Sequence, residues 1–246
     1  MPFQPTTRTK VRRVPKRGFY DEPTVHAILD EALICHLAFV HDGVPFAMPT
    51  LHARVGDTVY VHGSTASRMM RAVGAESVTA SLTVTLVDGL VLARSAFHHS
   101  MNYRSVVVVG ELRDVRDPEE KMAALEAFTE GLVPGRWDEV RWPSRKELKG
   151  TSIQALPLTE ASAKIRTGGP VDDEEDYALD VWAGVIPLSL EVGALEADPL
   201  NRDGVAPGDH VVGWTPSRRR GSTSEATRAS TASGENGATS AAARVA

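Results

Sequence analysis

Residues 77–87 alternate between apolar and hydroxyl-bearing side chains, and this pattern constrains the fold more than any other feature of the chain. The apolar positions are Val78, Ala80, Leu82, Val84 and Leu86. A period of two places these side chains on one face of a β-strand and the Ser and Thr hydroxyls on the other. The sequence therefore predicts a strand with one buried face, which belongs to a sheet that covers a core.

Several further segments predict strands joined by tight turns. The predicted strands are residues 46–55, 58–62, 90–97 and 105–115, and residues 151–166 also look extended. Turns are indicated by His41-Asp42-Gly43, Val55-Gly56-Asp57 and Asp88-Gly89. Helical spacing predicts a helix over residues 23–37. Residues 68–73 could form a short helix, and another begins at Asp117, with Pro118 in its first turn. We expect a mainly β fold with flanking helices, and a small antiparallel β-barrel is favoured over a βαβ array.

The two ends of the chain differ in composition from the middle. Residues 1–17 carry six Lys or Arg and no acid, a bias that transit peptides share, and we interpret residues 1–20 as a solvated basic arm. Residues 216–246 have almost no large apolar side chains to offset the entropy of ordering, so they predict a disordered tail. One domain is expected over residues 21–215.

Composition excludes several classes of protein. Lys and Arg number 27 against 32 Asp and Glu, and the resulting charge of −5 does not attract nucleic acid or anionic membranes. The single cysteine, Cys35, rules out an intrachain disulfide and reads as a packed core residue. No secretory signal or apolar run long enough to span a bilayer is visible. We expect a cytoplasmic protein with neither a membrane nor a nucleic-acid partner.

Common catalytic motifs are also missing from the sequence. It contains no G-x-G-x-x-G, no P-loop, no H-E-x-x-H and no G-x-S-x-G. Dinucleotide-fold dehydrogenases, P-loop enzymes, zincins and standard α/β-hydrolases are therefore disfavoured.

Two polar segments are candidates for binding. The first is residues 62–68, His-Gly-Ser-Thr-Ala-Ser-Arg, where a strand runs into a possible helix start. Its hydroxyls, Arg68 and free N–H groups suit a phosphate, and Gly63 permits close approach of the backbone. A capped helix start is an equally good interpretation. The second is residues 97–105, dense in hydrogen-bond donors between two strands, which resembles a binding loop more than a solvated connection.

A metal site is not predicted. His52, His62, His98 and His99 lie on or beside predicted strands, but no spacing pairs them on one face and no acid is near them in the sequence. The acidic run at residues 172–176 is interpreted as a solvated loop.

These segments form part of an ordered set between roughly residues 12 and 190. The set comprises residues 13–20, 45–50, 62–68, 87–94, 99–106, 136–137, 163–166 and 182–187. In this set and order the chain resembles the pyridoxamine 5′-phosphate oxidase-like flavoproteins, within the branch of flavin-nucleotide-binding and nitroimidazole-resistance-like proteins.

The resemblance implies a split β-barrel that forms a homodimer and holds FMN in clefts at the subunit interface. Met48, Pro49 and Thr50 would then lie along the isoalloxazine. The ribityl phosphate would be held by His62, Gly63, Ser64, Ser67 and Arg68. The site would be closed by Ser100, Tyr103, Arg104 and Ser105. Trp182 would either approach the flavin from the partner chain or belong to the core.

The chain departs from true pyridoxamine phosphate oxidases near its C-terminus. No Arg-x-His element and no Arg-, Trp- and Pro-rich ending follows Trp182, which argues against pyridoxal phosphate synthesis.

Two classes of function follow from the resemblance. One is an FMN-dependent oxidoreductase that reduces a small molecule, such as a nitro compound or a quinone, with a nicotinamide donor. His98 or His99 could donate a proton there, although both also read as loop histidines bonded to backbone. The alternative is a flavin carrier or sensor without turnover. A third interpretation has the same barrel binding a deazaflavin or haem.

Overall fold

The computed structural model of the chain describes residues 3–67, 70 and 77–216. The strands are β1 (Gly18–Phe19), β2 (Ile34–His41), β3 (Val44–Val55), β4 (Thr58–Ser64), β5 (Val78–Leu92), β6 (Ser100–Asp114), β7 (Thr151–Pro157), β8 (Glu160–Arg166) and β9 (Gly184–Pro187). The helices are α1 (Glu22–Glu31), α3 (Pro118–Leu132), α4 (Arg145–Gly150) and α5 (Asp209–Val212), with 3-10 turns η1 (Pro15–Arg17), η2 (Ala96–His98) and η3 (Glu174–Ala178).

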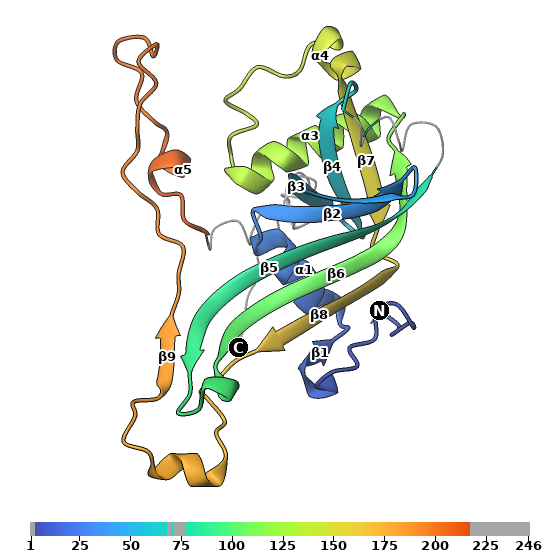
Figure 1. The fold of residues 1–246 in the computed structure, drawn as a ribbon. Coiled ribbons are helices and arrows are strands. Elements are labelled where there is room, and N and C mark those ends of the chain that lie inside the picture. The colour runs from blue at the N-terminus through green and yellow to red at the C-terminus, as the bar shows by residue number, and fades with distance from the viewer. Residues whose placement is uncertain (1–2, 68–69, 71–76, 217–246) are drawn as a thin grey trace, which may run out of the picture.

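The strands close into a ring in which every pairing is antiparallel. Its order is β6–β7–β4–β3–β2–β5, and β5 pairs back onto β6. β8 and then β1 continue the sheet from β6, while β9 is added along β5 (Figure 1). The fold is therefore the mainly β, antiparallel split barrel with flanking helices that the sequence predicts.

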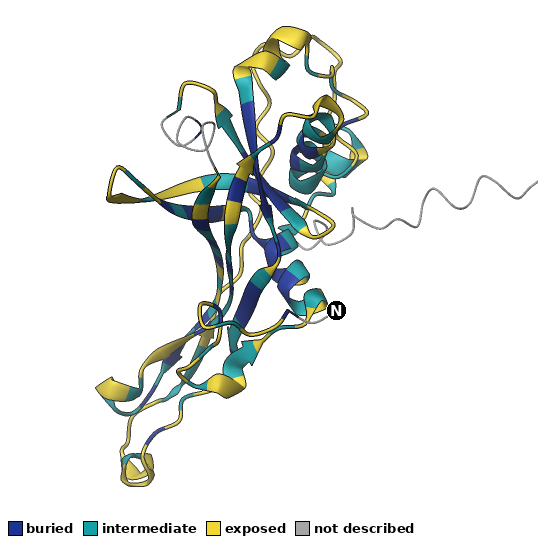
Figure 2. Ribbon diagram, turned by 90° about the vertical axis from the view of Figure 1, so that its right-hand side faces the viewer, coloured by how far each residue is buried: buried dark blue, intermediate teal, exposed yellow. Residues whose placement is uncertain are grey.

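The core fills the ring, and the predicted apolar face of β5 is part of it. Ala80, Leu82 and Val84 are buried, and Val78 and Leu86 pack partly buried against them. Figure 2 shows the buried residues concentrated in the crossing strands and the helices beside them, whereas the far ends of the strands are exposed. The alternation of apolar residues in the sequence thus correctly predicts the buried face of β5.

Two local predictions are confirmed by their turn and cap geometry. The β2–β3 hairpin turns at Asp42 and Gly43, both with positive φ (51° and 74°), as Asp-Gly turns require. At the start of α3, the Asp117 carboxylate accepts the Glu120 N–H at 2.9 Å, and Pro118 occupies the first turn.

The predicted helix over residues 23–37 is wrong in its second half. The helix α1 ends at Glu31, and residues 34–41 form β2, in which Cys35, Leu37 and Phe39 are buried on alternate positions. Helical and strand spacings overlap where the two elements meet, and pairing with both β3 and β5 decides in favour of the strand.

The predicted turn at Asp88-Gly89 is also wrong, because β5 continues through it to Leu92 with only a bulge between Val87 and Gly89. Gly89 serves another purpose: a Cβ there would lie 3.0 Å from the carbonyl oxygen of Ile186 in β9. β6 correspondingly begins at Ser100, so much of the predicted polar loop at residues 97–105 is strand.

The N-terminal basic arm packs on the barrel instead of lying free in solvent. Phe3 is buried, and its N–H donates to the Tyr20 carbonyl at 2.7 Å. Arg8 forms an ion pair with Glu160 of β8. Burial of Phe3 and the ion pair attach the arm to the outer sheet.

A long extension follows β9 on the other side of the molecule. It leaves the barrel, runs alongside it and returns through α5 (Figure 1), where the Trp214 indole N–H donates to the Leu132 carbonyl at 2.6 Å. We call residues 188–208 the C-terminal arm. Exposed apolar side chains on it are Leu188, Leu190, Val192, Leu195, Leu200 and Val205.

Parts of the sequence predictions fall outside the described residues. These are the predicted disordered tail, apart from Pro216, and the predicted helix over residues 68–73, apart from Met70. Among the helices of the described part, none is long and apolar enough to cross a membrane.

Candidate functional site

The predicted phosphate turn follows the end of β4. The Ser67 N–H donates to the Ser64 carbonyl at 2.8 Å, the Ala66 N–H to Ser64 Oγ at 3.2 Å, and the Met70 N–H to Ser67 Oγ at 3.2 Å. Both serine oxygens thus accept from the backbone, which leaves each hydroxyl its own hydrogen to donate. The turn can offer two O–H donors to an anion. Arg68, predicted to join them, lies outside the described residues.

Gly63 has a packing explanation in this chain. A Cβ at this position would lie 2.8 Å from Cε of Met70, whose side chain is buried. A larger residue would require the flexible end of the Met70 side chain to shift, so packing favours the glycine without requiring it. Its predicted contact with a cofactor stays a prediction.

The residues predicted to line the isoalloxazine lie on β3. Met48, Pro49 and Thr50 pair with residues 35–37 of β2, and the Met48 side chain is 38% exposed. They are accessible to a ligand.

Arg104, predicted to help close the site, is held by two carboxylates. Its guanidinium donates to Glu31 Oε2 at 2.5 Å and to Asp88 Oδ1 at 2.7 Å. Hydrogen bonds to Asp88 and then to Glu31 raise the pKa of Arg104 further above its ordinary value. The charge of Arg104 is already matched by acids of this chain.

The remaining predicted residues of β6 lie on the part of the strand that borders β5 and β8. The Ser105 hydroxyl donates to the Lys164 carbonyl at 3.3 Å, Tyr103 pairs with Arg166, and Ser100 pairs with Val91.

The predicted site residues form two separate groups within one chain. The row of paired residues through Met48 continues to Leu37, Leu82 and Val108, so β2 and β5 separate β3 from β6. At about 4.8 Å per strand, that is about 14 Å across the sheet, and Arg104 lies four residues farther along β6 than Val108. The two groups thus do not form one cluster on the sheet.

A cavity of about 370 Å³ lies between α3 and the strands β3 and β4. Leu51, Phe128 and Leu132 contribute apolar walls, and Arg136 also lines it. His62 lines this cavity too, with its ring centroid 4.5 Å from that of Phe128. Burial lowers the pKa of His62, and its buried Nδ1 finds no hydrogen-bond partner among the described residues.

The family resemblance assigns His62 to the ribityl phosphate of the flavin, and no sequence pattern predicts this cavity. The one relevant signal in the sequence is the helical spacing of the apolar residues Leu125, Phe128 and Leu132.

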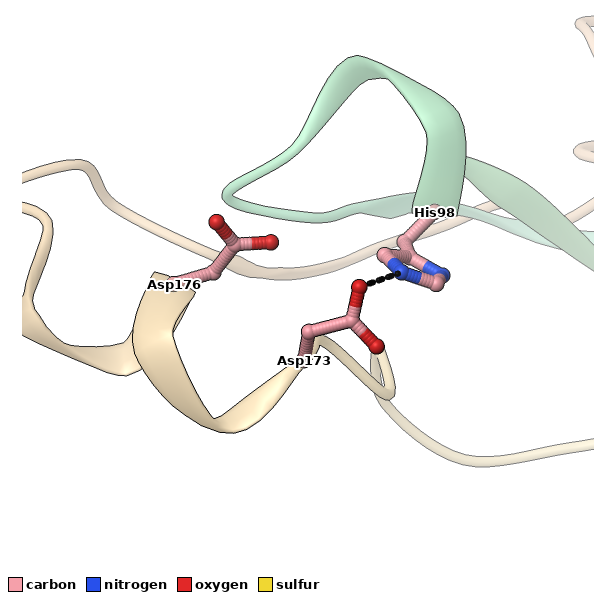
Figure 3. A group of neighbouring side chains, drawn as sticks. All are labelled: His98, Asp173 and Asp176. Carbon is pink, nitrogen blue, oxygen red and sulfur yellow. Dashed lines mark hydrogen bonds and ion pairs between the residues drawn. The ribbon is translucent and has the colours of Figure 1, made fainter.

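The two candidate proton donors have different surroundings. His99 Nδ1 lies 3.0 Å from the Ser95 carbonyl, as a loop histidine bonded to backbone would. His98 Nε2 lies 3.3 Å from Asp173 Oδ2, and Asp176 is their neighbour (Figure 3). Ligand atoms of these three residues fall within 4.8 Å of one another. Because Asp173 is exposed, its contact with His98 also fits an ordinary surface ion pair.

The acidic run differs from the predicted solvated loop at its first residue. Asp172 is buried, and its carboxylate accepts the Arg94 N–H at 3.0 Å and the Arg94 side chain at 3.1 Å. Trp182 is 67% exposed, so within one chain it is no core residue.

Cys35 is buried in the barrel core, as predicted, and burial raises the pKa of its thiol to about 12. We expect a chromogenic disulfide reagent to leave the native protein unmodified and to release one equivalent only after denaturation. Rapid labelling of the folded protein would contradict the burial of Cys35.

Comparison with known proteins identifies the family to which this fold belongs. The family model described as pyridoxamine 5′-phosphate oxidase matches residues 21–165. The chain belongs to the pyridoxamine 5′-phosphate oxidase-like family. A search of curated proteins returns no match.

The chain is similar to two solved structures over nearly the whole length of each of those proteins. The flavocytochrome Anf3 from Azotobacter vinelandii is 42% identical, with a TM-score of 0.81 over 87% of this chain and 99% of that one. The FAD and haem binding protein from Mycobacterium smegmatis is 36% identical, with a TM-score of 0.76 over 80% of this chain and 96% of that one.

A 5-nitroimidazole antibiotic resistance protein from Bacteroides thetaiotaomicron shares the fold. It is 19% identical, with a TM-score of 0.50 over 60% of this chain and 86% of that one. The split barrel of the oxidase-like family is thus recovered at low identity as well.

Proposed function

We propose that this protein is a flavin-dependent oxidoreductase that works as a homodimer. The observation that carries the proposal is the likeness, over 99% and 96% of their lengths, to two structures described as a flavocytochrome and as an FAD and haem binding protein. The Ser64–Ser67 turn supports it, because two hydroxyls that accept from the backbone and can each donate an O–H suit a phosphate. The separation of the two predicted residue groups supports a site completed by a second subunit.

The sequence predicts FMN, and the Mycobacterium smegmatis structure is described with FAD. Both flavins share the isoalloxazine, the ribityl chain and the first phosphate, so the predicted residues would serve either one. Bound flavin would supply the redox chemistry, passing the electron pair of a nicotinamide to a nitro or quinone acceptor. The chain's own task is to anchor the phosphate with Ser64 and Ser67 and to position the ring on Met48, Pro49 and Thr50.

Removing one phosphate donor tests the flavin site. In Ser67→Ala we expect flavin to bind about tenfold more weakly, because a hydrogen bond to a charged group contributes about 1.5–3 kcal/mol. Thr85→Ala, which removes an exposed hydroxyl on β5, should leave affinity unchanged. Flavin fluorescence quenching on titration of the apoprotein gives both affinities, and acid extraction followed by chromatography distinguishes FMN from FAD.

Turnover separates the oxidoreductase from the alternative, a flavin carrier or sensor. Anaerobic reduction by NADH or NADPH and rapid reoxidation by a quinone or nitro compound are the expected results. Tight flavin binding with no reduction by either donor would instead support the carrier.

We also propose haem as a second cofactor, which the cavity beside α3 favours. Apolar walls suit a macrocycle, a neutral imidazole suits iron, and a cation at the rim suits a propionate. An absorption spectrum of the purified protein with a Soret band, beside the flavin bands, is the expected observation.

A further inference from the structure

We propose that Arg166 and Arg17 form a binding site for a dianionic phosphate group. The site lies where the end of β8 meets η1, far from the Ser64–Ser67 turn within one chain. Arg166 pairs with Tyr103 near the start of β6, whereas β7, the neighbour of β4, pairs with β6 from Arg113 onward. Ten residues of strand separate these two pairings, which is about 33 Å at about 3.3 Å per residue.

Arg166 is a buried cation that no carboxylate of the described residues neutralises. The residue is 6% exposed, and its guanidinium donates to Asn102 Oδ1 at 2.5 Å and to the carbonyls of Gly168 and Gly169 at 3.2 Å and 3.1 Å. These acceptors are neutral, so they satisfy N–H groups but leave the positive charge unmatched. A buried charge without a counter-charge is strongly unfavourable.

Other arginines of low exposure show the usual solution. Three arginine side chains that are 9%, 24% and 26% exposed each form an ion pair with a carboxylate: Arg54, Arg94 and Arg104. Arg166 has no such partner in the described part of the chain. An anion from outside the chain would supply the missing counter-charge.

Arg17 adds a second positive charge beside Arg166. Burial, and then the charge of Arg17, lower the pKa of Arg166, as expected for a desolvated cation next to another one. Arg17 is partly buried, and its side chain forms no hydrogen bond or ion pair with the described residues. Both guanidinium groups would therefore be stabilised by an anion between them.

The packing of β1 holds Arg17 in this position. Gly18, the next residue, pairs with Lys164 of β8 (Figure 1), two residues before Arg166. A Cβ at Gly18 would lie 2.9 Å from Cβ of Val11, so a side chain there would push the basic arm away. The glycine thus lets the arm lie close to β8 and keeps Arg17 at the end of that strand.

A phosphate monoester fits these two cations. At neutral pH it carries a charge of about −1.5 to −2, because its second pKa is about 6. A guanidinium has five N–H donors in a planar fork that suits phosphate oxygens. Three hydrogen bonds to the protein leave Arg166 two of them. The group could come from inorganic phosphate or from a nucleotide, such as the 2′-phosphate by which NADP differs from NAD.

The experiment measures binding to the full-length protein, as purified and in phosphate-free buffer. Isothermal titration calorimetry gives affinities for inorganic phosphate, NADP⁺ and NAD⁺. In Arg17→Ala we expect phosphate affinity to fall about tenfold or more, because a hydrogen bond between charged groups is lost. Arg166→Gln should weaken binding as well. Arg116→Ala, which removes a charge from a side chain that is 78% exposed elsewhere, should bind as wild type does.

The outcomes distinguish the source of the phosphate from failure of the site. A preference for NADP⁺ over NAD⁺ that disappears in Arg17→Ala supports a nucleotide 2′-phosphate, and phosphate binding without that preference supports free phosphate. No binding of phosphate or NADP⁺ by wild type, or equal affinities in wild type and Arg17→Ala, would overturn the site. Far-UV circular dichroism checks folding, and Arg17→Ala decides if Arg166→Gln does not fold. A protein that binds phosphate here but takes up no flavin would overturn the proposed function alone.

Discussion

Replacing both Leu190 and Leu195 by aspartate is expected to convert the protein from a dimer to a monomer. Both side chains belong to the C-terminal arm, where they are 61% and 53% exposed in the single chain. Burying a leucine contributes about 1.5–3 kcal/mol, and in a two-fold dimer each substitution acts twice. Light scattering after size exclusion at micromolar concentration measures the change in mass.

The physical reason lies in the path of the arm. It stands away from the barrel between β9 and α5 (Figure 1), and the described part of the chain leaves the Leu190 and Leu195 side chains more than half exposed. Contiguous exposed apolar residues of this kind mark an interaction surface. We expect a second copy to occupy that space, which would also join the two groups of predicted flavin residues.

The flavin content of the Leu190→Asp/Leu195→Asp variant is therefore expected to fall together with its molar mass in solution. Glu191→Gln with Glu196→Gln alters polar neighbours on the same arm and should leave both dimer and flavin intact. A monomeric wild type with full flavin content would refute the shared site, and a dimeric Leu190→Asp/Leu195→Asp variant would refute the role of the arm.

Local patterns predict those parts of the fold in which a residue's neighbours in sequence decide its environment. The strand through Leu82 and the cap at Asp117 are of this kind, because alternation and side-chain capping act over a few residues. The closed ring of strands is predicted by the strand pattern together with the family resemblance.

Errors arise where distant pairing outweighs local preference. Asp88-Gly89 is a strong turn sequence, yet ladder bonds to β6 on one side and β9 on the other keep β5 extended there. Likewise, helical spacing up to Leu37 gives way to strand pairing from Ile34 onward. β5, which also pairs with β2, and β9, which pairs with β5, lie far along the chain, where a local pattern does not report them.

The candidate site shows the same limit. The turn at Ser64 and Ser67 is recognisable because its residues are consecutive. The cavity is not, since Leu51, His62 and Phe128 meet only when α3 packs on the sheet, and an apolar stripe does not say whether the facing layer is complete.

Arg104→Ala is expected to destabilise the protein by about 2 kcal/mol, below the value for fully buried pairs because the groups are partly solvated. The side chains of Arg104, Glu31 and Asp88 are 26%, 18% and 30% exposed. Without the guanidinium, two carboxylates that now bond to it are left close together and partly desolvated. Urea unfolding followed by circular dichroism gives the difference, and Arg116→Ala, which removes a side chain that is 78% exposed and 3.7 Å from its partner, should change stability little.

Acid should shrink this deficit, because carboxylates that become protonated no longer repel each other. A lysine at position 104 distinguishes two roles of Arg104. If its main role is to neutralise Glu31 and Asp88, Arg104→Lys restores part of the stability through charge alone but loses the two-sided fork of hydrogen bonds. Unchanged stability in Arg104→Ala, with a large loss of flavin affinity, would show instead that the guanidinium leaves these acids for the flavin site, which the family resemblance implies that Arg104 helps to close.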